Sequence, residues 1–286
     1  MTFAAPPLPE TPRFWADLKT TDFARLDKAR CIAVLPVGAI EQHGPHLPLD
    51  VDTVLVNGVV AASLAHLPQG AGSLPVLFLP TQAVGLSPEH AAFDGTLTLK
   101  AATVIALWTE LAESVAASGV NKLVLLNAHG GQVGLMDVVA RDLRARLGML
   151  VYSVSWFHLP LTGEQGQSVN DLFSAGEHRF GIHGGEIETS MMLALKPERV
   201  DMAQAQHFRS TAEDRAETFT ILGNGKSAKL AWQMQDYNAH GAAGNAAAAT
   251  AEKGRTVLNA AGRALAQLLV EIDQLPPGTL RSGPAR

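Results

Sequence analysis

Side chains that can bind a metal ion crowd one short segment of the sequence, residues 38–53 (GAIEQHGPHLPLDVDT). They are Glu41, His43, His46, Asp50 and Asp52. Carboxylate oxygens and neutral imidazole nitrogens together suit Zn²⁺, Mn²⁺ or Fe²⁺, and the segment has no cysteine of the kind that builds closed structural zinc sites. The pattern therefore predicts an open, catalytic metal centre. The structural alternative is that Asp52 and Thr53 cap the following helix and that Gly44 shapes a turn.

A second group, NAHGG at residues 127–131, carries His129. It follows a predicted strand and opens a predicted helix, so its glycines allow a sharp turn and leave helix amides available. His129 can then project back toward the strand ends and join the first group. The structural alternative is a hydrogen-bonded histidine in a glycine-rich turn.

A third group, HGGEIETS at residues 183–190, contains His183, Glu186 and Glu188. Because Glu186 and Glu188 lie two positions apart at the start of a predicted helix, they cannot both project from one helical face. One of them can reach a metal while the other satisfies the backbone or orients a histidine. In the structural alternative, either glutamate only stabilises the helix N-terminus.

The weakest candidates lie in the segment SPEH, residues 87–90, which FDGT follows at residues 93–96. Glu89 and His90 again come after a predicted strand. They either face a substrate or are solvated loop residues, and their chemistry alone favours neither.

The elements that must position these groups alternate along the chain. Short, continuous apolar runs predict buried strands at residues 31–37, 74–79, 122–126 and 149–154. Segments with helical spacing lie at residues 53–67, 98–118, 132–147, about 185–195 and about 245–272. This alternation favours an α/β fold with a mainly parallel sheet flanked by helices, in which ligands bind beyond the carboxyl ends of the strands. We expect a single domain over residues 1–286, with a Pro-rich arm at residues 1–13 and a loose tail at residues 276–286.

Composition excludes several classes of protein. The chain has 286 residues, 47% of them hydrophobic, and a formal net charge of −5 without a Lys/Arg-rich run, which argues against nucleic acid as a partner. The first ten residues do not resemble a signal peptide, and no apolar run approaches the roughly 18 residues that a membrane span needs. The single cysteine, Cys31, fits a reducing cytoplasm and is expected to pack as a small hydrophobe.

The four motifs occur in order over roughly residues 31–197, and with them the chain resembles the creatininase (creatinine amidohydrolase) family. The resemblance implies a three-layer α/β/α sandwich and a centre of two divalent ions, Zn²⁺ and/or Mn²⁺, or Fe²⁺. It implies that Glu41 and His129 hold one ion, that His43 holds the other, and that Asp52 bridges them. Family members commonly form rings of subunits, so a homo-oligomer, preferably a hexamer, is expected.

One position departs from creatininase itself, which carries a glutamate two residues after the histidine that matches His129. That position is Gly131 here. Glu186 or Glu188 is then expected to supply the missing oxygen, and Glu186 is preferred. The departure also weakens creatinine itself as the substrate.

The function expected is hydrolysis of a C–N bond in a small, cyclic amide such as a creatinine-like lactam, by a water that two ions activate. His183 is the candidate proton shuttle with Glu188 as its orienting partner or replacement, or Glu186 is the base. Glu89, His90 and the ring of Trp156 are the substrate-facing candidates.

Several alternatives stay open. Two of them are other enzymes of the same family, a formamide deformylase and a short-peptide peptidase. The third is a metal-binding protein on this fold that has no catalytic activity. A Rossmann-type nucleotide binder is disfavoured because Gly38 does not begin a G-x-G-x-x-G spacing.

Overall fold

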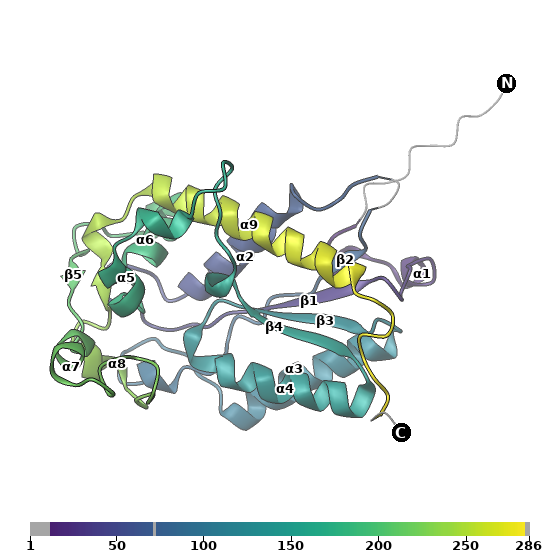
Figure 1. Ribbon diagram of the computed structural model, residues 1–286, viewed down its shortest axis with the longest axis horizontal. Helices are drawn as coiled ribbons and strands as arrows, with labels where there is room; N and C mark the ends of the chain where they lie inside the picture. Colours follow the sequence, from purple (N-terminus) through teal and green to yellow (C-terminus); the bar gives the residue numbers. More distant parts are fainter. Residues whose placement is uncertain (1–11, 71–72, 284–286) are drawn as a thin grey trace.

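A parallel four-stranded sheet forms the centre of the computed structural model, which describes residues 12–70 and 73–283 (Figure 1). In spatial order its strands are β2 (Val76–Phe78), β1 (Ile32–Val37), β3 (Lys122–Asn127) and β4 (Leu150–Ser155). All four strands lie where the apolar runs predict them. β2 is shorter than expected, because Pro75 has no amide hydrogen and the Leu74 carbonyl accepts a hydrogen bond from the Arg13 guanidinium (2.6 Å).

The strands are continuously apolar because both faces of the sheet are covered. In β1, Ile32 and Val34 pack into one core, whereas Ala33 and Leu35 pack into the other. Cys31 is fully buried in this second core, as expected for a small hydrophobe.

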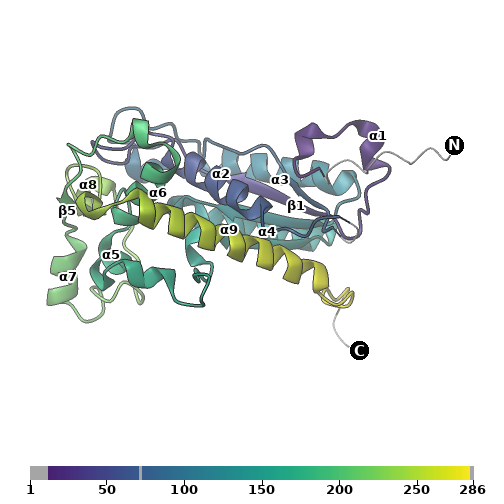
Figure 2. The same ribbon diagram turned by 90° about the horizontal axis from the view of Figure 1, so that it is seen from above.

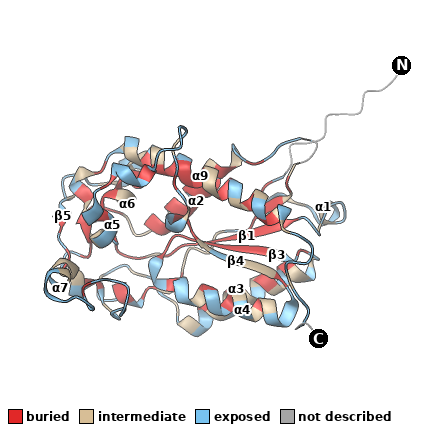
Figure 3. Ribbon diagram, in the orientation of Figure 1, coloured by how far each residue is buried: buried red, intermediate tan, exposed pale blue. Residues whose placement is uncertain are grey.

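Helices form the two outer layers, and their buried faces turn toward the sheet (Figure 3). One face is covered by α2 (Val51–Leu64), α6 (Glu186–Leu195) and α9 (Ala251–Gln274). The other face is covered by α3 (Ala101–Ala117) and α4 (Val133–Leu147). This arrangement confirms the three-layer α/β/α sandwich, and the bounds of these helices other than α9 differ from the expected ones by three residues or fewer.

The start of α9 differs more from the expectation. Asn245 lies instead in β6 (Gly244–Asn245), which pairs with β5 (His207–Phe208), and residues 246–248 form a 3-10 helix. Thr250 then caps α9 by accepting the Lys253 amide (3.2 Å). The pairing of β6 therefore overrides the high helix propensity of the alanine-rich run.

Short elements gather beyond one end of the sheet, at the left of Figure 1. They are α5 (Ala175–Phe180), α7 (Ala212–Thr218), α8 (Met234–Tyr237) and the β5–β6 pair. α9 runs along α2 and the sheet through the middle of the molecule, as the view from above also shows (Figure 2). α1 (Thr20–Phe23) lies at the opposite end.

The expected N-terminal arm falls mostly outside the described residues. Its last residue, Arg13, is buried, and its guanidinium donates to the carbonyls of Leu74 and Pro68 (2.6 Å each). No helix of the described residues is long and apolar enough to cross a membrane.

Candidate metal centre

The first and second groups meet because β1 and β3 end at the same edge of the sheet. Val37 pairs in register with Asn127, so residues 38–43 and His129 leave adjacent strands side by side. The Asn127 side chain fixes the turn, since its Oδ1 accepts the His129 amide (3.0 Å) and its Nδ2 donates to the His129 carbonyl (2.7 Å). His129 is thereby held toward the first group.

Asp52 lies between two histidines. It stands in the first turn of α2, with Oδ1 3.6 Å from His43 Nε2 and Oδ2 3.4 Å from His129 Nδ1. Glu41 Oε1 lies 3.1 Å from His129 Nδ1 and 3.8 Å from His43 Nε2. All four side chains are buried. The structure thus brings Glu41, His43, Asp52 and His129 into one cluster.

Backbone carbonyls fix the protonation of three imidazoles at the cluster. His43 Nδ1 donates to the Glu41 carbonyl (3.0 Å), His129 Nε2 to the Leu86 carbonyl (2.9 Å) and His183 Nε2 to the Gln42 carbonyl (2.6 Å). Because a carbonyl can only accept, the other nitrogen of each ring carries the lone pair whenever the ring is neutral, as it must be to bind a metal, and that nitrogen faces Glu41. Histidines that bind metals are oriented in this way.

His90 is oriented differently. Gln42 Oε1 accepts the Gly44 amide (2.9 Å), so Gln42 Nε2 donates to His90 Nδ1 (2.7 Å). The proton of His90 then sits on Nε2, 3.6 Å from Glu41 Oε1. His90 Nε2 therefore offers a proton to the cluster and has no lone pair with which to bind a metal.

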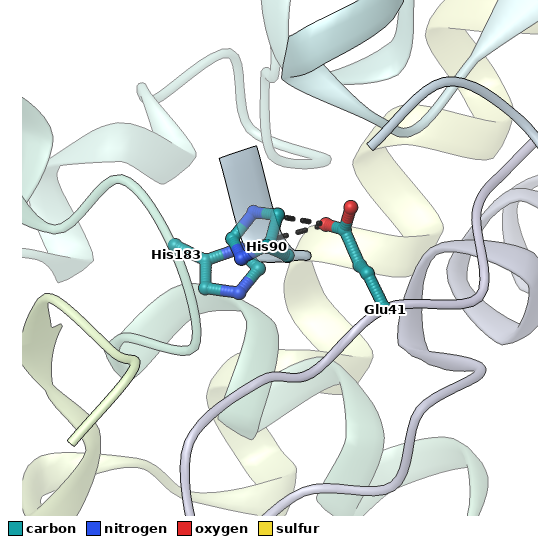
Figure 4. Close-up of side chains that lie close together, drawn as sticks. All are labelled: Glu41, His90 and His183. Carbon is teal, nitrogen blue, oxygen red and sulfur yellow. Dashed lines mark ion pairs between the residues drawn. The ribbon is translucent and has the colours of Figure 1, made fainter. Parts of the chain in front are cut away.

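His183 lies in the middle of a stack of three imidazoles. Its ring centroid is 4.1 Å from that of His43 and 4.1 Å from that of His90. Its Nδ1 lies 3.7 Å from Glu41 Oε1, and Figure 4 shows His90 and His183 pointing toward the same carboxylate oxygen. The third group is thus joined to the first.

Several buried atoms of the cluster have no hydrogen-bond partner among the described residues. They are Glu41 Oε1 and Oε2, His43 Nε2 and Asp52 Oδ2. Buried carboxylates without partners are costly, and ligand atoms that converge within 4.8 Å of one another are what a cation needs. The donor set of carboxylates and lone-pair imidazoles therefore fits divalent metal ions.

The electrostatics follow from this crowding. Burial alone would lower the pKa of His43, but Asp52, Glu188 and Glu41 raise it to about 9. Burial raises the pKa of Glu188 to about 7, although His43 opposes the shift. Burial also lowers the pKa of His90 to about 4.

Comparison with known proteins agrees with this geometry. The family model described as "Creatininase: Creatinine amidohydrolase" matches residues 16–269. The chain belongs to the creatininase family. This membership confirms the resemblance seen in the motifs, and with the buried ligand cluster it identifies a metal-dependent hydrolase of that family.

Three relatives show the range within this creatininase family. A mycofactocin precursor peptide peptidase of Mycobacterium tuberculosis is 32% identical over 79% of this chain and 80% of its own length. A creatinine amidohydrolase of Pseudomonas putida is 32% identical over 63% of this chain and 70% of its own length. A solved structure titled "Creatininase Mn" is 27% identical, with a TM-score of 0.71 over 92% of this chain and 99% of that chain.

The two glutamates of the third group do point in different directions. Glu188 Oε2 accepts the Gly184 amide (2.6 Å) and lies 3.9 Å from His43 Nε2, in a group with His43 and His183. Glu186 instead forms an ion pair with Lys253 of α9. Lys253 thus offsets the charge of Glu186, the glutamate preferred from the sequence, whereas Glu188 lies among possible metal ligands.

Glu89 and His90 are buried, which removes the alternative of solvated loop residues. Glu89 Oε1 lies 3.3 Å from His129 Nε2 and shares a possible ligand group with Glu41 and His129. Asp50, in contrast, is half-buried and pairs with Arg199 (2.8 Å). It has no contact with the cluster that would tune it.

Trp156 is buried and lines a largely apolar cavity of about 370 Å³ that reaches Glu188. Apolar lining residues are Phe157, Leu161, Phe173, Ile182, Ile187 and Val257. The cavity extends from Glu188 to residues of α5, and Trp156 forms part of its wall.

Some residues of the site were not singled out in the sequence. Gln42 orients both His90 and His183, and its only signal is its position between Glu41 and His43. Lys253 lies far along the chain in α9, where nothing local marks it as the partner of Glu186.

Proposed function

We propose that the protein hydrolyses a C–N bond of a small amide with a water activated at a two-metal centre. The observation that carries this proposal is the position of Asp52, whose two oxygens face His43 Nε2 and His129 Nδ1. A carboxylate placed in this way can bridge two cations. Membership of the creatininase family supports the same chemistry.

The residues divide into two sets around Asp52. Glu41 and His129 would hold one ion, and His43 with Glu188 would hold the other. When bound, two divalent ions, Mn²⁺ or Zn²⁺ or else Fe²⁺, lower the pKa of a water and polarise the amide carbonyl.

Proton transfer to the leaving nitrogen is assigned to His183. Burial lowers its pKa well below the usual value, so the ring is neutral, and its Nε2 proton is held by the Gln42 carbonyl. Nδ1 is then available to accept a proton at the cluster. The stack with His43 and His90 keeps the ring in place.

A small, cyclic amide such as a creatinine-like lactam remains the first candidate substrate. The apolar cavity beside Glu188, with Trp156 and Phe157 in its wall, suits a flat or apolar group next to the scissile bond. The second candidate is a short peptide. The similarity to a mycofactocin precursor peptide peptidase favours it, since an apolar side chain would fit the same cavity.

Metal analysis followed by a hydrolysis screen tests the proposal. The screen should contain lactams, cyclic ureas, imides, formamides and short peptides. We expect about two equivalents of divalent ion per chain. Asp52→Ala should bind less than one equivalent of metal and lose at least about a hundredfold in activity. Asp50→Ala, the matched control, should keep both ions and its activity. A wild-type protein with less than one equivalent, unaffected by Asp52→Ala, would favour a binding protein without turnover.

Subunit assembly is a separate proposal. The family resemblance favours a homo-oligomer, with a hexamer preferred. Light scattering of the purified protein would measure the mass directly, and a monomer would contradict it.

A further inference from the structure

A second cavity, also of about 370 Å³, lies next to the candidate metal centre and has a different character. Its charged lining residues are all basic. They are Arg179, Arg215, Lys226 and Lys229. Within residues 12–70 and 73–283, no aspartate or glutamate lines it. We call it the basic cavity.

The four cations of the basic cavity form no ion pair with a described carboxylate, although Arg215, after Arg209, helps to lower the pKa of the Asp214 carboxyl. None of them lies within ion-pair distance of a described carboxylate. Arg209, close to Arg215 in the chain, does find such partners in Asp214 (2.6 Å) and Glu213 (3.4 Å). The positive charge of the cavity is therefore available to a ligand.

Two of the cations are held in place by other contacts. Arg215 Nη1 donates to Thr211 Oγ1 (3.1 Å), and its guanidinium lies 4.9 Å from the centroid of the Tyr237 ring. Among the described residues, Arg215 Nη2 is buried without a hydrogen-bond partner, and the guanidinium charge also acts on the Tyr237 hydroxyl. Arg179 Nη2 donates to the Gly223 carbonyl (2.8 Å). A buried, unpartnered guanidinium nitrogen costs free energy that an anionic acceptor would recover.

The basic cavity adjoins the metal centre at two points. Trp232 lines it, and the Trp232 ring stands edge-on to His90 with centroids 6.1 Å apart. Ile182, which precedes His183 in the chain, lines both the basic cavity and the apolar cavity beside Glu188. The two cavities are therefore neighbours, and a substrate that extends past Ile182 would place an amide beside Glu188 and an acidic group in the basic cavity.

We propose that the basic cavity binds an anionic group of the substrate, a carboxylate or a phosphate, while the amide lies at the cluster. Guanidinium groups bind both kinds of anion through charge-assisted hydrogen bonds. The proposal rests on the proposed function and narrows it, because it requires an acidic amide rather than a neutral one. Four cations around one small cavity that opens to solvent, in a chain of net charge −5, fit a single small anion and not a nucleic acid backbone.

The first experiment compares matched amides, one with a free carboxylate and one with that carboxylate methylated. The wild-type holoenzyme should prefer the acidic amide. Arg215→Gln should reduce that preference by roughly tenfold or more. Arg209→Gln, which changes a paired arginine outside the cavity, should preserve it. Lys226→Gln and Lys229→Gln change exposed side chains that the fold does not need, and each should reduce the preference by about two- to fivefold.

The second experiment measures binding of inorganic phosphate by calorimetry and does not depend on turnover. Phosphate should bind with an affinity that Arg215→Gln lowers and Arg209→Gln does not. If phosphate binds in this way but no amide is hydrolysed, the anion site stands and the proposed function fails. The basic cavity is not an anion site if amides are hydrolysed without preference for the acidic member. The same conclusion follows if the affinity for phosphate is unchanged in the Arg215, Lys226 and Lys229 variants.

Discussion

The carboxylate of Glu89 occupies the space that a side chain at Gly131 would need. A Cβ atom added to Gly131 would overlap Glu89 Oε1 and also crowd His129 Nε2. The family resemblance implies a glutamate at the position of Gly131 in creatininase itself. In this chain a carboxylate enters the same space from the 3-10 helix Pro88–His90. Glycine and Glu89 are therefore complementary, and a larger residue at 131 must displace Glu89.

The first prediction compares two neighbouring glycines. Gly131→Ala should push Glu89 and His129 apart and destabilise the protein by about 1–2 kcal/mol, with weaker metal binding. Gly130→Ala is the matched control, since nothing lies within 4 Å of a Cβ there. Thermal unfolding and metal content after dialysis would measure both effects.

A compensating pair makes this prediction sharper. Gly131→Glu combined with Glu89→Ala moves the carboxylate from one backbone position to the other. The double variant should bind more metal than either single variant. Equal metal content in all three would contradict a shared place for the two carboxylates.

The second prediction separates the two glutamates of α6. Glu188→Gln should lose about one equivalent of metal, because its carboxylate lies beside His43 and His183. Glu186→Gln should keep both ions and lose only stability, by about 1 kcal/mol, since Lys253 is partly exposed and can be hydrated. Elemental analysis and thermal unfolding of the two variants distinguish these outcomes. Loss of metal from Glu186→Gln alone would restore the preference drawn from the sequence.

Much of the fold and part of the site follow from local sequence. The strands are predictable because burial on both faces requires continuous apolar runs, and most helix bounds are predictable because burial on one face requires apolar residues at helical spacing. Glu41, His43, Asp52 and His129 are predictable as a cluster because parallel strands end together.

The remaining features depend on packing between distant segments. The observation that favours Glu188 over Glu186 as a ligand is the contact of Glu186 with Lys253, 67 residues farther along the chain. The basic cavity takes Arg179, Arg215, Lys226 and Lys229 from outside the four motifs, so no motif reveals it. The β5–β6 pairing that delays α9 likewise leaves no local signal.

The third prediction concerns acid stability. His46 is buried, its Nε2 lies 2.9 Å from Thr189 Oγ1, and its ring stacks on Phe208. Burial, with the nearby charge of His43, lowers its pKa to about 4. In the unfolded chain His46 binds a proton below about pH 6.5, whereas in the folded protein it stays neutral down to about pH 4. Stability should therefore fall as the pH drops from 6.5 to 4, by up to roughly 3 kcal/mol.

His46→Gln provides the test for this acid sensitivity. Glutamine can still hydrogen-bond Thr189 but does not titrate. Urea unfolding at a series of pH values should give a shallower loss of stability for the variant between pH 6.5 and 4. An unchanged slope would show that His46 is already protonated or solvated in the folded protein.

The fourth prediction concerns the metal-free protein. Here the contribution of Glu188 to stability is lost as the pH rises, whereas that of His46 is lost as the pH falls. Burial raises the pKa of Glu188 to about 7, so the metal-free folded protein keeps a proton that the unfolded chain releases near its ordinary pKa. That contribution to stability is complete below about pH 4.5 and is lost as the pH rises through 7, by up to roughly 3 kcal/mol.

Metal ions replace the proton and bind deprotonated carboxylates more tightly. The increase in melting temperature on adding Mn²⁺ should therefore grow from pH 5 to pH 8. Glu188→Gln should flatten the pH dependence of the metal-free protein, and a metal effect independent of pH would place Glu188 outside the metal centre.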